Sequence, residues 1–143
     1  MELVLIVDDS NVDRFIAKSL VHSTNRVKSS SLQPSGFSAL EYLTKSCENE
    51  NIYLWPDMIL LDVGMPVIDG YTFIQEYVKF CNERRKKTVL IILTIDGKSP
   101  EIQKYIDDGI VSMYIQKPFK HKHMQEIIKL YLDVRVQTPV DQT

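Results

Sequence analysis

The chain has 143 residues, of which 44% are hydrophobic and 25% are charged, as in an ordinary globular domain. Its formal net charge of −2 and its pI of about 5.9 argue against a nucleic-acid-binding surface. Its apolar runs are far shorter than the roughly 20 residues that a membrane-spanning helix needs, and no secretory signal follows Met1, so we expect a cytoplasmic protein.

The first strand and the first helix are predicted within residues 3–20. Residues 3–7 are an unbroken apolar run that ends in Asp8 and Asp9, which predicts a strand buried on both faces. Residues 12–20 carry apolar side chains at helical spacing, and Asp9 or Ser10 is suited to cap this helix. Three polar residues of the helix are expected to face outward: Asp13, Arg14 and Lys18.

A weaker strand, a second helix and a third strand follow. Residues 27–32 are serine-rich and include a lysine, as is common in an edge strand. Residues 34–36 break this strand, and apolar side chains within residues 39–43 mark a short helix. Residues 58–62 predict another fully buried strand, and its last residue is Asp62.

The third helix and the fourth strand are predicted after Gly70. The basic run at residues 83–87 ends this helix, since cations suit the C-terminal end of a helix dipole. Residues 89–93 are a fully apolar strand that ends in Thr94. Cys47 and Cys81 are expected to be free, buried thiols, as is usual in a cytoplasmic protein. The third helix places four apolar side chains on one face: Ile74, Tyr77, Val78 and Cys81.

The last two helices flank a fifth strand. Ser99 and Pro100 are suited to begin a helix, and Gly109 is suited to end it. Residues 110–115 predict a strand that leads to Lys117. We expect one domain over residues 1–133 and a frayed tail over residues 134–143. The last helix presents four apolar side chains on one face: Met124, Ile127, Ile128 and Tyr131.

Five strands that alternate with five helices predict an α/β fold with a parallel, doubly wound sheet. The first, third and fourth strands are the most apolar, so they belong in the centre, and the second and fifth belong at the edges. This arrangement fits the strand order 2-1-3-4-5.

Three acidic residues are expected at one edge of this sheet. Asp8, Asp9 and Asp62 follow or end neighbouring strands, and the carboxyl ends of parallel strands meet at the same edge. Two like charges 4 Å apart repel by about 4 kcal/mol at an effective dielectric constant near 20. A divalent cation relieves this repulsion, and clustered carboxylates suit Mg²⁺. Thr94 and Lys117 reach the same edge, where they can donate to phosphate oxygens.

These residues, in this order, resemble the receiver domain of two-component response regulators, which has a flavodoxin-like fold. The resemblance covers residues 2 to about 133. Each motif is weak alone, but five motifs at the correct strand ends are specific. The motifs are Asp8-Asp9, Asp62 with Met65-Pro66, Asp69-Gly70, Thr94 and Lys117-Pro118-Phe119.

The resemblance implies that Asp62 accepts a phosphoryl group from a phosphohistidine on a sensor kinase or phosphotransfer protein. It also implies a Mg²⁺ site, which Mn²⁺ could occupy as well. Lys117 would neutralise the phosphoryl group. The implied metal ligands are Asp9 and Asp62 directly, Asp8 largely through water, and the backbone carbonyl of Gly64.

The family also implies a switch, in which Thr94 binds the phosphoryl group and the aromatic ring of Tyr114 turns inward. The Lys117–Pro118 peptide bond is cis in the family. Two residues depart from the common pattern. Ile95 is branched where the family usually has a small residue, and Asp96 can approach the phosphoryl group or order a water. We hypothesise that Ile95 and Asp96 set the lifetime of the phosphorylated state.

Three functions are compatible with these residues. The first is a stand-alone response regulator that is not an enzyme and signals through protein–protein contact, as a monomer or weak homodimer. Its downstream partner is expected on the face formed by the helix after Ser99, the strand at 110–115 and the last helix. The second is a receiver-like scaffold that is not phosphorylated. The third is an aspartate-nucleophile phosphatase of the haloacid dehalogenase type, whose Asp-x-Asp signature is absent because position 10 is Ser.

Overall fold

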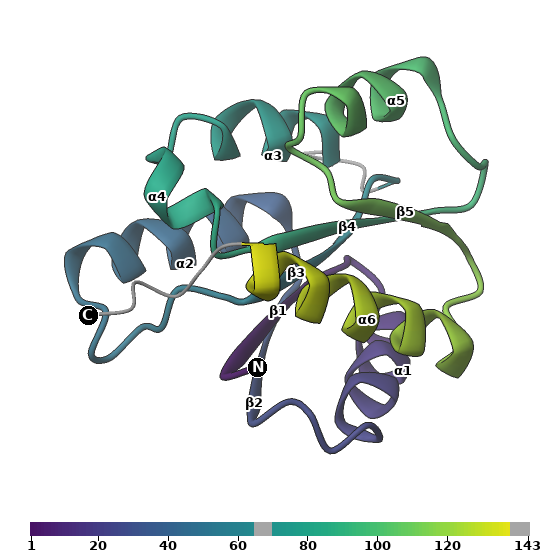
Figure 1. The fold of residues 1–143 in the computed structure, drawn as a ribbon, viewed down its shortest axis with the longest axis horizontal. Helices are drawn as coiled ribbons and strands as arrows, with labels where there is room; N and C mark the ends of the chain where they lie inside the picture. Colours follow the sequence, from purple (N-terminus) through teal and green to yellow (C-terminus); the bar gives the residue numbers. More distant parts are fainter. Residues whose placement is uncertain (65–69, 138–143) are drawn as a thin grey trace.

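A computed structural model describes residues 1–64 and 70–137 of the chain. Helices and strands alternate along it, with one additional short helix between α3 and β4 (Figure 1). The elements are β1 (Leu3–Val7), α1 (Asn11–His22), β2 (Ser29–Gln33), α2 (Gly36–Glu48), β3 (Met58–Asp62), α3 (Gly70–Tyr77), α4 (Asn82–Arg85), β4 (Val89–Thr94), α5 (Pro100–Asp107), β5 (Met113–Gln116) and α6 (His121–Gln137).

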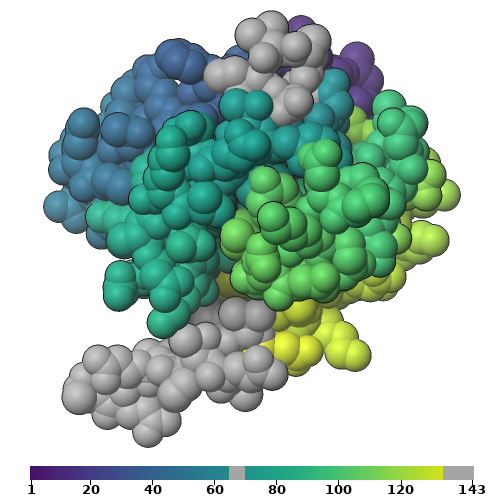
Figure 2. Space-filling view, turned by 90° about the horizontal axis from the view of Figure 1, so that it is seen from above, coloured from purple at the N-terminus to yellow at the C-terminus, as the bar shows by residue number. Residues whose placement is uncertain are grey.

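The strands form one parallel sheet in the order β2-β1-β3-β4-β5, as the sequence predicts. Every residue of β1, β3 and β4 is buried, because these central strands have helices on both faces. Helices α1 and α6 cover one face, and α2, α3 and α5 cover the other (Figure 1). Figure 2 looks down on the second face, where these helices hide the strands.

The core has two layers because successive strand residues point to opposite faces of the sheet. In β1, Val4 and Ile6 pack toward α1 and α6, whereas Leu5 and Val7 pack toward α2, α3 and α5. The same alternation in β3 and β4 gives each helix layer an apolar surface. Burial of these side chains is the main favourable term in folding.

The strand register determines which residues meet at the carboxyl edge of the sheet. Val7 pairs with Leu61, so that Asp8 follows β1 next to Asp62, the last residue of β3. Asp62 in turn pairs with Leu93, the residue before Thr94. The residues that follow β1 and that end β3 and β4 are therefore brought together at one edge.

The structure has six helices within the described residues, whereas the sequence pattern predicted five, because the predicted third helix is divided in two. Helix α3 ends at Tyr77, and Cys81 has an extended backbone before α4 begins. The ring of Phe80 packs against Trp55, with 5.4 Å between centroids, and the Arg85 side chain donates to the Phe80 carbonyl at 2.9 Å. This packing outweighs the helical periodicity.

Apart from Lys18, which is exposed as predicted, the orientation of α1 differs from the prediction. Its buried residues are Ala17 and Val21, while Val12 and Phe15 are 67% and 68% exposed. Ala17 and Val21 pack in the core, and Asp13 lies one turn before Ala17 on the same face of the helix, so it is turned toward Lys117. Arg14 donates to the Asp8 carbonyl at the same edge of the sheet. Ser10 caps the helix by accepting from the Asp13 backbone N–H at 3.1 Å.

Several boundaries also differ from the predictions. The second and fifth strands begin two and three residues later than predicted, and Val27 and Val111 are buried without being part of a strand. Both cysteines are free, as predicted, but they are exposed: Cys47 lies near the end of α2, and Cys81 lies in the turn before α4.

Two predicted segments lie outside the described residues. They are the Met65-Pro66 loop with Asp69, and the last six residues of the predicted tail; α6 extends to Gln137. No helix in the described part of the chain is both long enough and apolar enough to cross a membrane.

Candidate functional site

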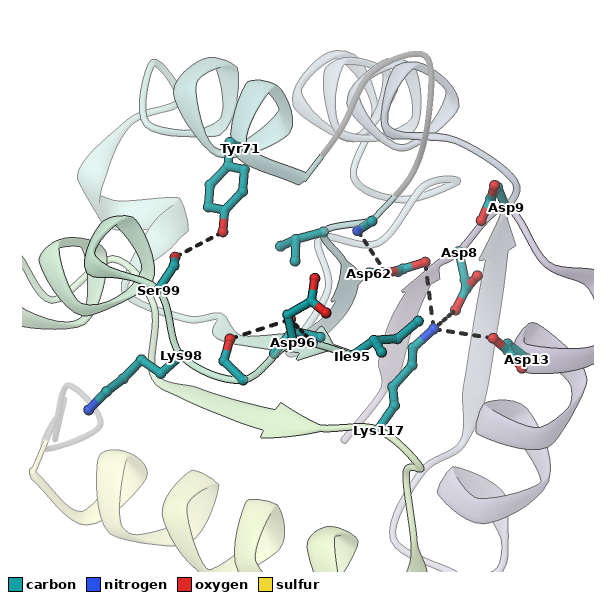
Figure 3. A pocket seen from close by; sticks show the side chains of 14 residues that line it. Asp8, Asp9, Asp13, Asp62, Tyr71, Ile95, Asp96, Lys98, Ser99 and Lys117 are labelled. Carbon is teal, nitrogen blue, oxygen red and sulfur yellow. Dashed lines mark hydrogen bonds and ion pairs between the residues drawn. The ribbon is translucent and has the colours of Figure 1, made fainter.

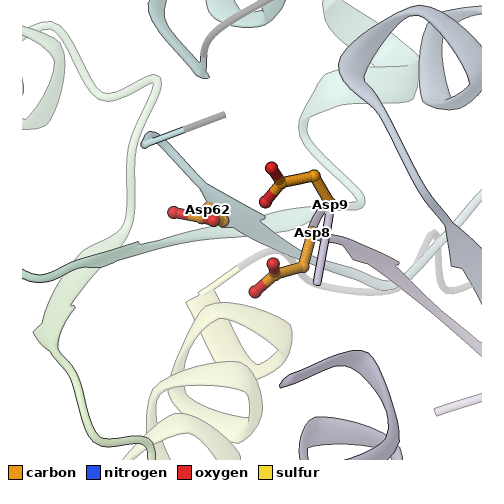
Figure 4. A group of neighbouring side chains, drawn as sticks. All are labelled: Asp8, Asp9 and Asp62. Carbon is orange, nitrogen blue, oxygen red and sulfur yellow. The ribbon is translucent and has the colours of Figure 1, made fainter. Parts of the chain in front are cut away.

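Three carboxylates meet at the carboxyl edge of the sheet, where the register places them. One oxygen from each of Asp8, Asp9 and Asp62 lies within 4.8 Å of the others (Figure 4). Asp8 and Asp62 are buried, with 3% and 7% exposure, and Asp9 is exposed. Carboxylate oxygens are hard ligands, so this group suits Mg²⁺ or Mn²⁺.

The ammonium group of Lys117 enters the same site from the segment after β5. Its Nζ lies 3.2 Å from Asp8 Oδ2 and 3.6 Å from Asp62 Oδ2 (Figure 3). Burial lowers the pKa of Lys117, but the nearby carboxylates of Asp62 and Asp8 outweigh this effect and raise it. Lys117 is therefore cationic at neutral pH and compensates part of the negative charge.

The Asp8 carboxyl has a pKa above its ordinary value. Burial is the largest cause, and the charge of Asp62 adds to it. Two contacts lower the pKa of Asp8 but do not cancel the increase. The backbone N–H of Ser10 donates to Asp8 Oδ1 at 3.0 Å, and the charge of Lys117 lies nearby. The net shift shows that the protein alone does not fully stabilise the negative charge on Asp8.

The loop after β3 is held against Asp62. The Gly64 backbone N–H donates to Asp62 Oδ1 at 2.9 Å, so one oxygen of this carboxylate is fixed. Gly64 also lines the cavity above the carboxylates, which has a volume of about 560 Å³. This cavity is large enough for a metal ion together with a phosphoryl group.

The segment after β4 forms the opposite wall of the cavity. Thr94 is buried, with 5% exposure, and its hydroxyl accepts from the Asp96 backbone N–H at 3.3 Å. Ile95 is 72% exposed, and the carboxylate of Asp96 points toward the middle of the cavity (Figure 3). Every predicted residue of the phosphoryl and metal site therefore lies around one cavity.

Tyr114, the predicted switch residue, does not line this cavity. It lies in β5, is half-buried, and packs at the edge of the core on the α2, α3 and α5 side. The Lys98 ammonium lies over its ring, 5.6 Å from the centroid. The Lys117–Pro118 peptide bond is cis.

Several residues that line the cavity were not predicted to belong to the site, among them Asp13 and Tyr71. Asp13 was expected to face outward, but its carboxylate lies 3.2 Å from Lys117 Nζ. Tyr71, in the first turn of α3, places its hydroxyl 3.0 Å from Ser99 Oγ and so joins α3 to the start of α5 beside the cavity. Asp13 lies in the first turn of the helix that directly follows Asp8-Asp9, and this position near the other acids was a signal that could have identified it.

Comparison with known proteins agrees with this geometry. The model of the response regulator receiver domain family matches residues 4–129. Sensor histidine kinase CheAY from Helicobacter pylori is 30% identical over 131 residues, which are 89% of this chain and 14% of that protein. The probable C4-dicarboxylate response regulator DctR from Bacillus subtilis is 25% identical, over 98% of this chain and 56% of that protein. The chain thus spans less than two thirds of the length of each of these curated relatives.

Solved structures share the fold along nearly the whole chain. A two-component response regulator from Cytophaga hutchinsonii has a TM-score of 0.82 at 22% identity, covering 93% of this chain and 98% of that chain. Chemotaxis protein CheY4 from Vibrio cholerae has a TM-score of 0.67 at 24% identity, covering 90% and 97%. At these identities the similarity establishes the fold and no more.

Proposed function

This chain belongs to the response regulator receiver domain family, and on that premise we propose that it is a signalling domain of the cytoplasm in which Asp62 accepts a phosphoryl group. The donor is a phosphohistidine on a histidine kinase or phosphotransfer protein. One observation carries the proposal: the Asp62 carboxylate lies beside two further carboxylates and 3.6 Å from the Lys117 ammonium group.

The chemistry requires little beyond position and charge. An Asp62 oxygen attacks phosphorus, the P–N bond to the donor imidazole breaks as the P–O bond forms, and the leaving nitrogen takes up a proton. Phosphoryl transfer of this kind depends mainly on alignment and on neutralising the oxygens of the transferred group. The Gly64 N–H orients Asp62, and Lys117 supplies a positive charge next to the attacking carboxylate.

A divalent cation completes the proposed site. Asp8, Asp9, Asp62 and the Gly64 carbonyl would hold it, and the carboxylate cluster is the observation that supports this assignment. When bound, Mg²⁺ neutralises negative charge on the transferred oxygens.

Output is proposed to follow a change at Thr94 and Tyr114. Thr94 would bind the phosphoryl group, and an inward turn of the Tyr114 ring would break its contact with the Lys98 ammonium. The surface that changes is the α5–β5–α6 face, where we expect the downstream partner or a second copy in a weak homodimer.

The phosphodonor is proposed to approach over the apolar residues beside the cavity. Ile16 and Ile95 are 46% and 72% exposed, and with Phe119 they line a second hollow that shares Lys117 with the first. A donor protein must cross this surface to bring its imidazole to Asp62. Ile16→Ser should therefore slow transfer from a phosphodonor protein and leave transfer from acetyl phosphate unchanged; equal slowing of both would contradict this role.

The function is tested by incubating the protein with Mg²⁺ and acetyl phosphate, followed by intact mass measurement. We expect a single phosphoryl adduct in the wild type, none in Asp62→Asn, and none when the metal is chelated. Glu101→Gln, which removes an exposed acid from α5 outside the cavity, is the matched control and should retain the adduct.

The two alternative functions give different results in the same experiment. A scaffold that is not phosphorylated would show no adduct under any condition. An aspartate-nucleophile phosphatase would turn over added phosphoesters rapidly and repeatedly. Either result would overturn the proposal.

A further inference from the structure

Lys117 is held in part by Asp13, a carboxylate that has no part in the proposed metal site. Its Nζ donates hydrogen bonds to Asp8 and to Asp13, both at 3.2 Å. Asp62 lies farther away, at 3.6 Å, which is an ion-pair distance but too long for a good hydrogen bond. Figure 3 shows Lys117 between these carboxylates, with Asp13 on the side of α1.

The directions of these contacts matter for the reaction. A lysine ammonium group has three N–H donors, and two of them point to Asp8 and Asp13. A phosphoryl group on Asp62 needs at least one close donor from Lys117, because a charge-assisted hydrogen bond to phosphate is short. The third N–H is left for that group, but Nζ lies 3.6 Å from the Asp62 oxygen and is held in place by its two hydrogen bonds, so the phosphoryl group and the two carboxylates compete for the position of Nζ.

The contact of Lys117 with Asp13 is easier to lose than its contact with Asp8. The side chain of Asp13 is 44% exposed, whereas that of Asp8 is 4% exposed. Water can replace Lys117 at Asp13, but burial makes an unpaired Asp8 costly. Asp13 also adds a negative charge to the wall of the cavity that would hold the phosphoryl group, and like charges repel.

We propose that Asp13 is a positioning residue that holds Lys117 on the α1 side of the cavity and so competes with the phosphoryl group for its ammonium. This proposal rests on the proposed function of Asp62. Asp13 disfavours the phosphorylated state by keeping Lys117 in its resting position. Its removal makes the pocket more receptive to a phosphoryl group.

A simpler role for Asp13 is to complement the dipole of α1, since it lies in the first helical turn. Glu101 has the same kind of position in the first turn of α5 but does not contact Lys117. A comparison of Asp13→Asn with Glu101→Gln therefore separates the ion pair from a general effect of helix charge.

The test measures the affinity for beryllofluoride, a phosphoryl mimic, at saturating Mg²⁺ by isothermal titration calorimetry and fluorine NMR. Asp13→Asn should bind it roughly fivefold more tightly, a gain in the range of a partly exposed ion pair. Asp13→Glu keeps a carboxylate within reach of Lys117 and should restore affinity toward the wild type. Glu101→Gln should match the wild type.

Unchanged or weaker binding in Asp13→Asn would overturn the proposal, as would an equal gain in Glu101→Gln. Absence of binding in the wild type would instead contradict the function of Asp62, so the two failures are distinguishable. Circular dichroism checks that each variant folds. If Asp13→Asn does not, Asp13→Ser serves in its place, because serine also suits the start of a helix.

Discussion

A Cβ atom at Gly70 would lie 2.5 Å from the Cα of Val63, the residue that follows Asp62. The first residue of α3 therefore packs directly against the backbone at the end of β3, and this contact is possible only without a side chain. The Gly70 N–H also faces the Val63 carbonyl at 3.4 Å. The position of α3 and the position of Asp62, the proposed phosphoryl acceptor, are coupled through this pair.

Gly70→Ala should lower the free energy of unfolding by about 3 kcal/mol, because the clash is with backbone that cannot rotate away. Gly109→Ala is the control: its φ is 75°, but nothing lies within 4 Å of the added Cβ, so only backbone strain of about 1 kcal/mol is expected. Urea unfolding measures both. Mg²⁺ affinity should fall only in Gly70→Ala, and a similar small effect of both substitutions would contradict the coupling.

Repulsion within the carboxylate cluster should lower the stability of the metal-free protein, so removing one of these charges should raise it. Asp9 has no ion pair within the described residues, although Asp8 and Asp62 lie near it, so Asp9→Asn should raise the metal-free melting temperature. An increase of about 2–4 °C corresponds to roughly 1 kcal/mol in a protein of this size. Asp62→Asn should act in the same direction, and less strongly because Lys117 already compensates Asp62.

Addition of Mg²⁺ should raise the melting temperature of the wild type by mass action and that of Asp9→Asn much less. Asp133→Asn, an exposed substitution on α6, controls for the change in net charge. A lower metal-free melting temperature in both site variants would mean that these acids are already stabilised by the protein.

Asp8 should give metal binding a pH dependence that lies above the ordinary titration range of an aspartate. Its folded-state pKa is raised, chiefly by burial, so the folded protein holds a proton at Asp8 more strongly than the unfolded chain does. This proton binding stabilises the metal-free folded protein at low pH. The stabilisation is lost as the pH rises from the ordinary aspartate pKa of 3.8 through the raised pKa of Asp8. Mg²⁺ requires the ionised form, so its affinity should fall as the pH falls through the raised pKa of Asp8.

Calorimetric titration of Mg²⁺ at several pH values measures this effect. Asp8→Asn should bind Mg²⁺ more weakly at every pH but with a flatter pH profile, because asparagine does not titrate. An identical profile in Asp8→Asn and the wild type would assign the pH dependence to another group.

The sheet and its functional edge could be predicted because both depend on local patterns. Unbroken apolar runs identify β1, β3 and β4, and the acids that end these runs must meet once the strands are parallel. Thr94 and Lys117 follow from the same rule, since each lies at or just after a strand end.

The errors arose where tertiary contacts outweigh local periodicity. Residues 78–81 continue a helical pattern, but the packing of Phe80 on Trp55 takes them out of the helix. In α1 the apolar pattern predicted the wrong buried face: the buried residues are Ala17 and Val21, and Asp13, at the same helical spacing, pairs with Lys117, more than 100 residues away. No local pattern reports a partner at that distance in the chain.

Ile95 and Asp96 are predicted to set the lifetime of the phosphoryl group on Asp62. Ile95 is 72% exposed beside the cavity, where its branched side chain would restrict the entry of water. Ile95→Ala should therefore speed dephosphorylation. Asp96→Ala should slow it, because this removes a carboxylate that points into the cavity and can order the attacking water.

The rates are measured as loss of the adduct by intact mass after removal of acetyl phosphate, with Mg²⁺ present throughout. A change of about tenfold in either direction corresponds to roughly 1.4 kcal/mol in the activation barrier. Ile52→Ala is the matched control, since Ile52 is 68% exposed but lies outside the cavity. Unchanged rates in both Ile95→Ala and Asp96→Ala would show that the lifetime is set elsewhere, with Lys117 and its contact to Asp13 as the next residues to test.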